Sequence, residues 1–181
     1  TLYAFSSENW KRPEAEVKAL MGLLAHFLKE KTPSLIENNI RLQVIGQIDK
    51  LPKSNQKSLQ KSIEATDGNN GLTLVVALSY GSREEILEAT RSLMEKAQSR
   101  EMDPAELNVE SFAAHLNTAD FPDPDLLIRT SGEYRISNFL LWQISYAEIF
   151  ITKTFWPDFR RQNLLDAVGE YQQRQRRFGG V

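Results

Sequence analysis

The stretch LTLVVALSYGSREE, residues 72–85, decides the fold class. Its first part, LTLVVAL at 72–78, is apolar without alternation, and a strand of that composition is buried on both faces. Ser82 and Glu85 have the spacing of a capping box, which predicts a helix directly after the strand. The inward face of that helix is predicted to consist of Ile86, Leu87, Leu93 and Met94. A doubly buried strand that leads into a helix is typical of an α/β protein.

Strands and helices alternate along the rest of the chain. Further strands are predicted at TLYAF 1–5, IRLQVIG 40–46, DLLIRT 125–130 and 148–152. Helices are expected from Pro13 onward, from Pro52 to Thr66, over 109–116, and from 158 to 177 before Gly179-Gly180. The first helix should present one apolar face made of Val17, Leu20, Met21, Leu24, Phe27 and Leu28. The alternation predicts an α/β fold, a mostly parallel central sheet flanked by helices, with its ligand site at the carboxyl ends of the strands.

Length and composition restrict the classes of protein that fit. With 181 residues and 41% hydrophobic content, the chain is predicted to be a single domain, 1–181. The net charge of −2 is spread evenly, so no nucleic-acid partner is expected. There is no cysteine, and no uncharged apolar run approaches the roughly 18 residues of a membrane span. Because the chain starts inside a predicted strand without methionine, we expect an amino-terminal truncation.

The segment RTSGEYRIS, 129–137, carries the strongest chemical signal. Two arginines, a threonine, two serines and a glycine within nine residues offer the donors that bind a phosphate or diphosphate. The alternative is a surface loop whose arginines pair with Glu133. The density of donors favours the anion site.

A second set of donors lies in SSENWKRP, 6–13, before the first long helix. Its donors are Ser6, Ser7, Asn9 and Arg12, and a helix amino terminus attracts anions. The same residues also satisfy the first N–H groups of a helix. On pattern alone, capping is favoured.

Glu148 stands in an otherwise apolar and aromatic run, FLLWQISYAEIFI at 139–151. A carboxylate in such surroundings needs a partner. It is either a Mg²⁺ ligand or an ion-paired core acid, and the pattern does not separate the two. The face from Val17 to Leu28 is likewise either ordinary core or the wall of an apolar tunnel.

Four blocks of the sequence resemble the cis-prenyltransferase family, and within it the bacterial undecaprenyl diphosphate synthases. They are YAFSSENWKRPEAEV, DLLIRTSGEYRISNFLLWQISYAEIF, WPDF and RRFGG, in the family's order from Thr1 to Gly180. The resemblance implies a parallel sheet with surrounding helices, a hydrophobic tunnel and a homodimer. It also implies Mg²⁺-dependent condensation of isopentenyl diphosphate onto an allylic prenyl diphosphate, usually farnesyl diphosphate, with a cis double bond formed at each step.

The resemblance assigns roles to individual residues. The isopentenyl diphosphate group is expected to be bound by Arg129, Arg135 and Ser137, and Mg²⁺ by Glu148. Catalytic residues of a loop that closes on the substrates are expected at Ser6, Asn9, Trp10 and Arg12, with a functional acid at Glu16. Asn9 is expected near the carbon that loses a proton. The carboxyl-terminal element that reaches the partner subunit's site is expected at Arg177, Phe178 and Gly179.

The implied product is a long polyprenyl diphosphate, the carrier lipid for cell-wall glycans. The implied location is the cytoplasm, with loose peripheral membrane contact for product release. The family's aspartate-glycine-asparagine-glycine-arginine-tryptophan block is absent, so the chain as given is predicted to be inactive. The alternative is a non-catalytic partner subunit of a heteromeric cis-prenyltransferase. A phosphoryl-transfer enzyme is disfavoured because no glycine-rich phosphate loop with its lysine occurs.

Overall fold

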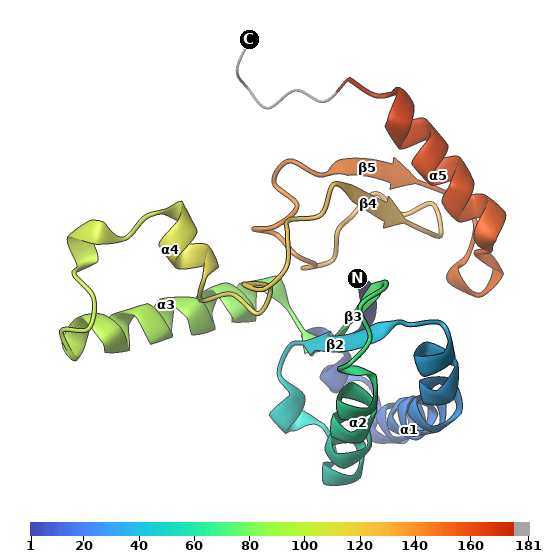
Figure 1. Cartoon of the computed structure of the whole chain (residues 1–181), viewed down its shortest axis with the longest axis horizontal. Coiled ribbons are helices and arrows are strands. Elements are labelled where there is room, and N and C mark those ends of the chain that lie inside the picture. The colour runs from blue at the N-terminus through green and yellow to red at the C-terminus, as the bar shows by residue number, and fades with distance from the viewer. Residues whose placement is uncertain (176–181) are drawn as a thin grey trace. The chain divides into compact units, whose positions relative to one another are not determined.

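The computed structural model describes residues 1–175 and divides the chain into two compact units (Figure 1). The first unit spans Thr1–Ala119, and the second begins at Asp120. Each unit has its own parallel sheet, so each is described by itself. The expectation that 1–181 forms a single domain stays a prediction.

The first unit is built on a three-stranded parallel sheet. Its strands are β1 (Leu2–Ser6), β2 (Arg41–Ile45) and β3 (Thr73–Tyr80), in the order β1-β3-β2. The predicted central position of the 72–78 strand is therefore confirmed. Val75, Ala77 and Leu78 of β3 are at most 5% exposed, because both of its edges are paired and both faces are covered.

Two helices make the crossover connections that parallel strands require. α1 (Glu14–Glu37) joins β1 to β2, and α2 (Lys53–Thr66) joins β2 to β3; the two helices pack side by side (Figure 1). Pro13 and Pro52 are the N-cap residues of α1 and α2. Pro13 was predicted to be the first helical residue, so the helix begins one position later than expected. The core between helices and sheet is made of Phe5, Met21, Leu51, Leu59 and Leu78.

The apolar face of α1 is narrower than predicted. Val17, Leu20, Leu24 and Leu28 pack against the core around Met21, but Phe27 is 49% exposed. At 100° per residue, Phe27 lies about 80° from the middle of this face, so it falls at the edge. Phe27 is therefore not part of the core of this unit, whereas the other residues of the face are.

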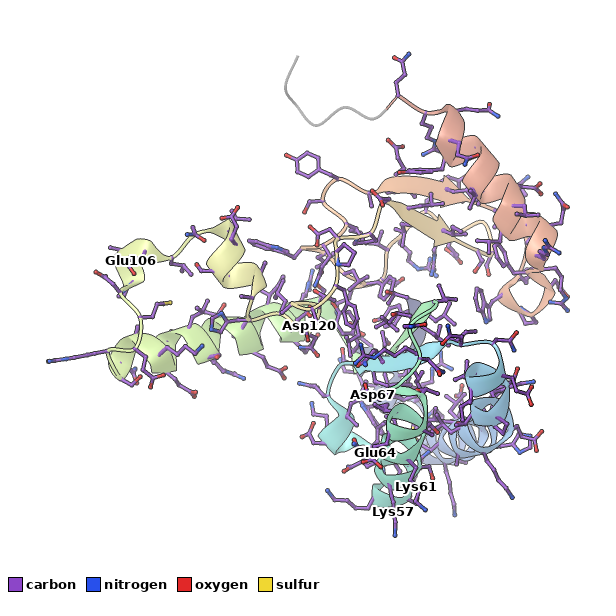
Figure 2. The ribbon with its side chains drawn as sticks, viewed as in Figure 1. Lys57, Lys61, Glu64, Asp67, Glu106 and Asp120 are labelled. Atoms are coloured by element: carbon purple, nitrogen blue, oxygen red, sulfur yellow. The ribbon has the colours of Figure 1, made fainter. Side chains whose placement is uncertain are left out.

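α2 is amphipathic without being apolar. Its buried side consists of Asn55, Leu59, Ser62 and Thr66. Figure 2 shows Lys57, Lys61 and Glu64 on the same helix, and all three are exposed. Polar groups on the buried side must find partners, and Asn55 does so by donating to the carbonyl of Met21 at 2.7 Å.

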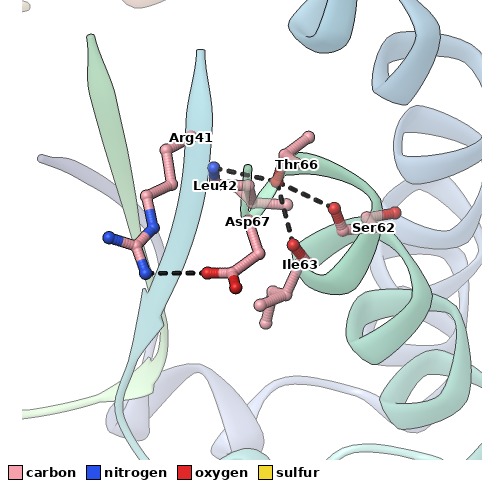
Figure 3. Close-up of polar contacts among 6 residues, drawn as sticks. All are labelled: Arg41, Leu42, Ser62, Ile63, Thr66 and Asp67. Carbon is pink, nitrogen blue, oxygen red and sulfur yellow. Dashed lines mark hydrogen bonds and ion pairs between the residues drawn. The ribbon is translucent and has the colours of Figure 1, made fainter. Parts of the chain in front are cut away.

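Thr66 fastens the end of α2 to the sheet (Figure 3). Its hydroxyl is fully buried, donates to the carbonyl of Ser62 at 2.9 Å, and accepts the N–H of Leu42 at 3.1 Å. Beside it, Arg41 and Asp67 form an exposed ion pair at 2.7 Å. The buried hydroxyl of Thr66 thus accepts the backbone N–H of Leu42, which has no partner in a neighbouring strand of the described sheet.

α3 (Ser82–Gln98) follows β3 directly, as predicted, but its start and its buried face differ from the prediction. Gly81 is the N-cap, so the capping box was wrong; Ser82 and Glu85 are instead buried. Leu87 and Met94 are 49% and 57% exposed, contrary to expectation. The buried stripe runs through Ser82, Glu85, Ala89 and Leu93.

The remaining elements are short. α4 spans Val109–Ala113, with Asn108 as its cap, and ends earlier than the predicted 109–116 helix. Single turns of 3-10 helix occur at η1 (Ser7–Lys11), η2 (Ile48–Lys50), η3 (Pro104–Glu106) and η4 (Trp156–Asp158). No helix within residues 1–175 combines the length and the apolar character needed to cross a membrane.

The second unit contains a two-stranded parallel sheet and one helix. β4 (Leu126–Arg129) pairs with β5 (Glu148–Ile151), which confirms both predicted strands. α5 (Arg161–Gln173) is shorter than the predicted 158–177 helix, because η4 precedes it and Arg174 is already extended. The predicted stop at Gly179-Gly180 lies outside the described residues.

Gly46, directly after β2, leaves no room for a side chain. Its φ is +109°, and a Cβ there would lie 2.2 Å from the carbonyl oxygen of Leu78. Gly46→Ala should therefore lower the free energy of unfolding of the first unit by about 2–4 kcal/mol, measured by urea denaturation. The matched control is Gly22→Ala in α1, where a Cβ meets nothing within 4 Å. That change should raise stability by about 0.5–1 kcal/mol. Equal effects of the two changes would contradict the tight approach.

Candidate functional site

The segment after β1 forms the η1 turn, held by local hydrogen bonds. The Oδ1 of Asn9 accepts the N–H of Ser6 at 2.9 Å, and the carbonyl of Asn9 accepts the N–H of Arg12 at 3.1 Å. These contacts close the η1 turn and do not cap α1, whose N-cap is Pro13 without a side-chain hydrogen bond, so the favoured interpretation as a cap of the first long helix was wrong. The catalytic roles assigned to Ser6 and Asn9 stay predictions.

Trp10 ties this segment to the central strand. Its indole N–H donates to the hydroxyl of Ser79 at 2.8 Å, although the two residues are 69 positions apart. Its ring also meets that of Phe5 edge to face, with centroids 5.0 Å apart. Trp10 is therefore half-buried against the core and fixes where the η1 turn lies on the sheet.

Arg12 and Glu16 lie further out at the start of α1. They form an ion pair of 2.6 Å, and each side chain is 47% exposed. An exposed pair of this kind contributes about 0–1 kcal/mol to stability. Both groups can consequently exchange partners at little cost, which suits residues that contact a ligand.

A buried polar network lies at the carboxyl end of the same sheet. The hydroxyl of Tyr80 donates to Glu85 Oε2 at 2.6 Å, and Glu85 Oε1 accepts the N–H of Asn117 at 2.9 Å. The side-chain oxygen of Asn117 accepts the N–H of Gly46 at 2.7 Å. Glu85 is 3% exposed, and the sequence pattern missed it because Ser82-Glu85 also fits a cap. The network joins the ends of β2 and β3 to α3 and to the turn after α4.

The RTSGEYRISN loop of the second unit contains an unusual density of left-handed backbone. Positive φ values occur at Ser131, Gly132, Ser137 and Asn138, and again at Leu140 just after the loop. Such conformations in residues other than glycine cluster at functional sites. The N–H groups of Ser131 and Gly132 bond to the carbonyls of Thr154 and Thr152, at 2.9 and 2.8 Å. These two donors thus hold the loop to the end of β5 and are not open to a ligand.

The two arginines of this loop differ in their surroundings. Arg135 is 69% exposed and pairs with Glu133 at 2.6 Å, which is the surface ion pair considered as the alternative. Arg129 ends β4, and its Nε is buried with no hydrogen-bond partner among residues 1–175. A buried guanidinium donor without a partner is costly, so this position favours an anion.

Glu148 begins β5 and has a cation beside it. Arg174 Nη1 lies 2.7 Å from Glu148 Oε2 and donates to the carbonyl of Ile149 at 3.0 Å. Arg174 Nη2 pairs with Glu170 at 2.5 Å. Hydrogen bonds to Glu170 and Glu148 raise the pKa of the Arg174 guanidinium. Of the two alternatives for Glu148, an ion-paired acid or a Mg²⁺ ligand, the structure shows the ion pair. The role as a metal ligand stays a prediction.

The strand register separates Arg129 from Glu148. Arg129 is paired with Ile151, and Glu148 with Leu126, so the two side chains belong to opposite ends of the same strand pair. Three residues along a strand correspond to about 10 Å. Ser6 to Glu16 belong to the first unit, and Arg129 to Glu148 belong to the second. Arg177 and Gly179 lie outside the described residues.

The donors present are compatible with Mg²⁺ that takes most of its ligands from a substrate. In residues 1–175 no group of three or more His, Asp or Glu side chains could hold a metal. Mg²⁺ commonly uses one or two carboxylates, with phosphate oxygens and water completing its shell. Glu148 supplies one such carboxylate, and in the described part of the chain no hydrogen bond reaches its Oε1.

Comparison with known proteins places the chain among prenyltransferases. The family model of undecaprenyl diphosphate synthases matches residues 1–179. An isoprenyl transferase of Bacillus cereus is 50% identical over all 181 residues, which cover 70% of that relative. One from Porphyromonas gingivalis is 51% identical over 179 residues, which are 99% of this chain and 70% of that relative.

Two solved structures share the fold. Lavandulyl diphosphate synthase from Lavandula x intermedia, in complex with dimethylallyl diphosphate, has a TM-score of 0.95 and 36% identity. The match covers 98% of this chain and 77% of that chain. A probable undecaprenyl diphosphate synthase from Campylobacter jejuni has a TM-score of 0.88 and 35% identity, over 99% of this chain and 82% of its own.

Two tyrosines, Tyr3 of β1 and Tyr80 at the end of β3, make the stability of the first unit depend on pH. Burial, followed by the charge of Glu8, raises the pKa of Tyr3 to about 12, and burial with the bond to Glu85 raises the pKa of Tyr80 well above its usual value. The neutral phenols are thus favoured by folding, and this stability, present below pH 10, is lost as the pH rises through 12. Between pH 9 and 11 we expect a loss of up to about 1 kcal/mol from Tyr3, reduced by solvent screening because its side chain is half-buried, and a loss of the same sign from Tyr80.

Urea denaturation of the whole chain at pH 9, 10 and 11 measures this loss. Tyr3→Phe should remove about half of the pH dependence. Tyr134→Phe is the control, because Tyr134 is 85% exposed. A pH dependence that is the same in the Tyr3→Phe protein and the unaltered protein would contradict the prediction.

Proposed function

This chain belongs to the undecaprenyl diphosphate synthase family of prenyltransferases, and we propose that it elongates a cis-polyprenyl chain. The proposed substrates are isopentenyl diphosphate and an allylic prenyl diphosphate, most simply farnesyl diphosphate. The allylic C–O bond breaks, and diphosphate leaves with the electron pair. The terminal alkene carbon of isopentenyl diphosphate then bonds to the allylic carbon, and loss of a proton restores a double bond. The proposed product is a long carrier lipid such as undecaprenyl diphosphate, used in cell-wall synthesis.

The observation that carries the proposal is the buried Nε of Arg129, which has no hydrogen-bond partner among residues 1–175. A guanidinium donor in this state is satisfied by an anion, and its planar fork matches phosphate oxygens. Arg135 and Ser137 follow on a loop rich in left-handed backbone, which is the proposed diphosphate-binding loop. Arg135 would exchange its exposed partner Glu133 for the diphosphate, since such a pair is weak.

The proposed roles on the first unit concern the allylic substrate. Ser6, Asn9 and Trp10 lie on the η1 turn, and Arg12 with Glu16 just beyond it. We propose that this segment lies over the reacting carbons, with Asn9 near the proton that is lost. A growing chain needs a dry channel, and each five-carbon unit is sheltered with a gain of roughly 3–4 kcal/mol. The tunnel, the homodimer, and a cytoplasmic location with membrane contact at product release belong to the same proposal.

Mg²⁺ would supply charge neutralisation for the leaving diphosphate. Glu148 would hold it through the carboxylate oxygen that Arg174 leaves open. Arg174 would keep the carboxylate oriented. The proposed reach of Arg177 and Gly179 into a partner's site concerns residues outside the described part of the chain.

Arg129→Met tests the proposal because it removes the cation and keeps most of the aliphatic stem. Loss of one charge-assisted contact should raise the KM for isopentenyl diphosphate about 10- to 150-fold. The assay follows labelled isopentenyl diphosphate with farnesyl diphosphate and Mg²⁺. It uses the chain preceded by the family's aspartate block, since the chain as given is predicted to be inactive.

The control for this experiment is Arg161→Met, a change of an exposed arginine in the same unit, which should leave KM unchanged. If the extended chain makes no polyprenyl product at all, the enzymatic proposal is wrong. A non-catalytic partner subunit would lose nothing when Arg129 is changed. Absence of product, together with equal stimulation of an active synthase by the Arg129→Met and unaltered chains, would favour that alternative, whereas an unaltered KM would show that Arg129 does not bind isopentenyl diphosphate.

Glu148→Gln tests the proposed metal role. The Mg²⁺ concentration for half-maximal activity should rise about tenfold or more, because an amide oxygen is a poorer Mg²⁺ ligand than a carboxylate. Calorimetric titration of Mg²⁺ with bound isopentenyl diphosphate should show the same loss. Glu170→Gln is the matched control, since Glu170 also pairs with Arg174. Equal Mg²⁺ requirements in the two variants would show that Glu148 is only an ion-paired acid.

A further inference from the structure

Ser79, next to last in β3, has a backbone conformation that its residue type disfavours. Its φ is +50°, in the left-handed region, and the residue is completely buried. Glycine would adopt this conformation without a steric penalty. Serine in this conformation has a strained backbone, which glycine would avoid. Strained residues persist where the surrounding contacts require them. The hydroxyl is the part that glycine would lack.

The contacts of Ser79 show what this hydroxyl does. It accepts the indole N–H of Trp10 at 2.8 Å, and the carbonyl of the same residue accepts the N–H of Gln47 at 3.2 Å. Ser79 is thereby fixed by the turn after β2 and in turn fixes Trp10. In a regular strand, side chains alternate between the two faces of the sheet. The left-handed backbone of Ser79 departs from this alternation, and its hydroxyl meets the Trp10 indole.

The bond to Ser79 is a long-range hydrogen bond of the η1 segment. The bonds of Asn9 to Ser6 and to Arg12 are local, and so is the Arg12–Glu16 pair. Local bonds shape the turn but do not place it on the sheet. The Trp10 indole therefore couples the whole segment to the end of the central strand.

We propose that Ser79 is a positioning residue, which holds Trp10 and with it the η1 segment in the place needed for prenyl transfer. The inference rests on the proposed function for its catalytic consequence. Its structural part, the coupling of Trp10 to Ser79, stands without it. Ser79 does not contact the substrates in this account and acts through Trp10.

The structural part is tested by NMR on the chain as given, with ¹⁵N-labelled tryptophan. Ser79→Gly removes the hydroxyl and relieves the backbone, so the protein should fold at least as well. Ser79→Ala removes the hydroxyl and keeps the Cβ. In both variants the Trp10 indole N–H should shift, and its hydrogen exchange should become about 2- to 12-fold faster. Thr90→Ala is the control, because it removes an exposed hydroxyl that donates within α3 to Ile86 at 2.8 Å.

Trp10→Phe completes a double-mutant cycle. It removes the indole N–H and keeps an aromatic ring against Phe5. Exchange of the Arg12 N–H, which reports on the turn, should be no faster in the double variant than in either single variant. Additive effects, or an unchanged indole exchange in Ser79→Gly, would overturn the inference.

The catalytic part is tested on the extended chain. Ser79→Gly should lower kcat by about the same factor as it speeds exchange, and the KM for isopentenyl diphosphate should stay within about twofold. Faster exchange with unchanged kcat would overturn the positioning role. If the proposed function itself is wrong, the unaltered extended chain makes no product, but the hydrogen-exchange results for Ser79 and Trp10 still hold. The two failures can therefore be told apart.

Discussion

The parallel pairing of β3 with both of its neighbours is the constraint on which the first unit depends. A strand paired on both edges and covered on both faces has no solvent to satisfy its polar groups, so its end must be closed by the protein. That closure explains the close approach of Gly46 to the carbonyl of Leu78 and the left-handed turn at Ser79. It also requires long crossovers, which α1 and α2 supply and which enclose the core.

The buried polar groups at this end follow from the same constraint. Glu85 is only 3% exposed, and a buried carboxylate is tolerated only when hydrogen-bond donors surround it. Tyr80 and the N–H of Asn117 are two of them. Because each member has a partner on a different element, the network restricts the relative movement of two strands and one helix. The η1 segment is held at this edge through the bond of Trp10 to Ser79.

Periodicity and composition predicted all five strands of the described chain, because strands buried in parallel pairs are apolar runs bounded by polar turns. They failed where one local pattern fits two structures. Ser82-Glu85 fits both a cap and a first turn that is buried, and only the packing of α3 selects the second. The position of Ser79 could not be predicted at all, since neither its φ nor its bond to a residue 69 positions away leaves a local pattern. Residue types indicated the anion-binding loop, but the pairing of Arg135 with Glu133 and the burial of Arg129 depend on tertiary structure.

The charges around Glu148 couple the binding of the metal to the binding of the diphosphate in the proposed reaction. One carboxylate, with one oxygen already bound to Arg174, offers a metal too few ligands for tight binding in the absence of substrate. A diphosphate supplies several further oxygens and most of the negative charge. Metal and allylic or homoallylic diphosphate should therefore bind cooperatively, each raising the affinity for the other. Arg174 reinforces this dependence, because its positive charge opposes a bare Mg²⁺ but is offset once the diphosphate is present.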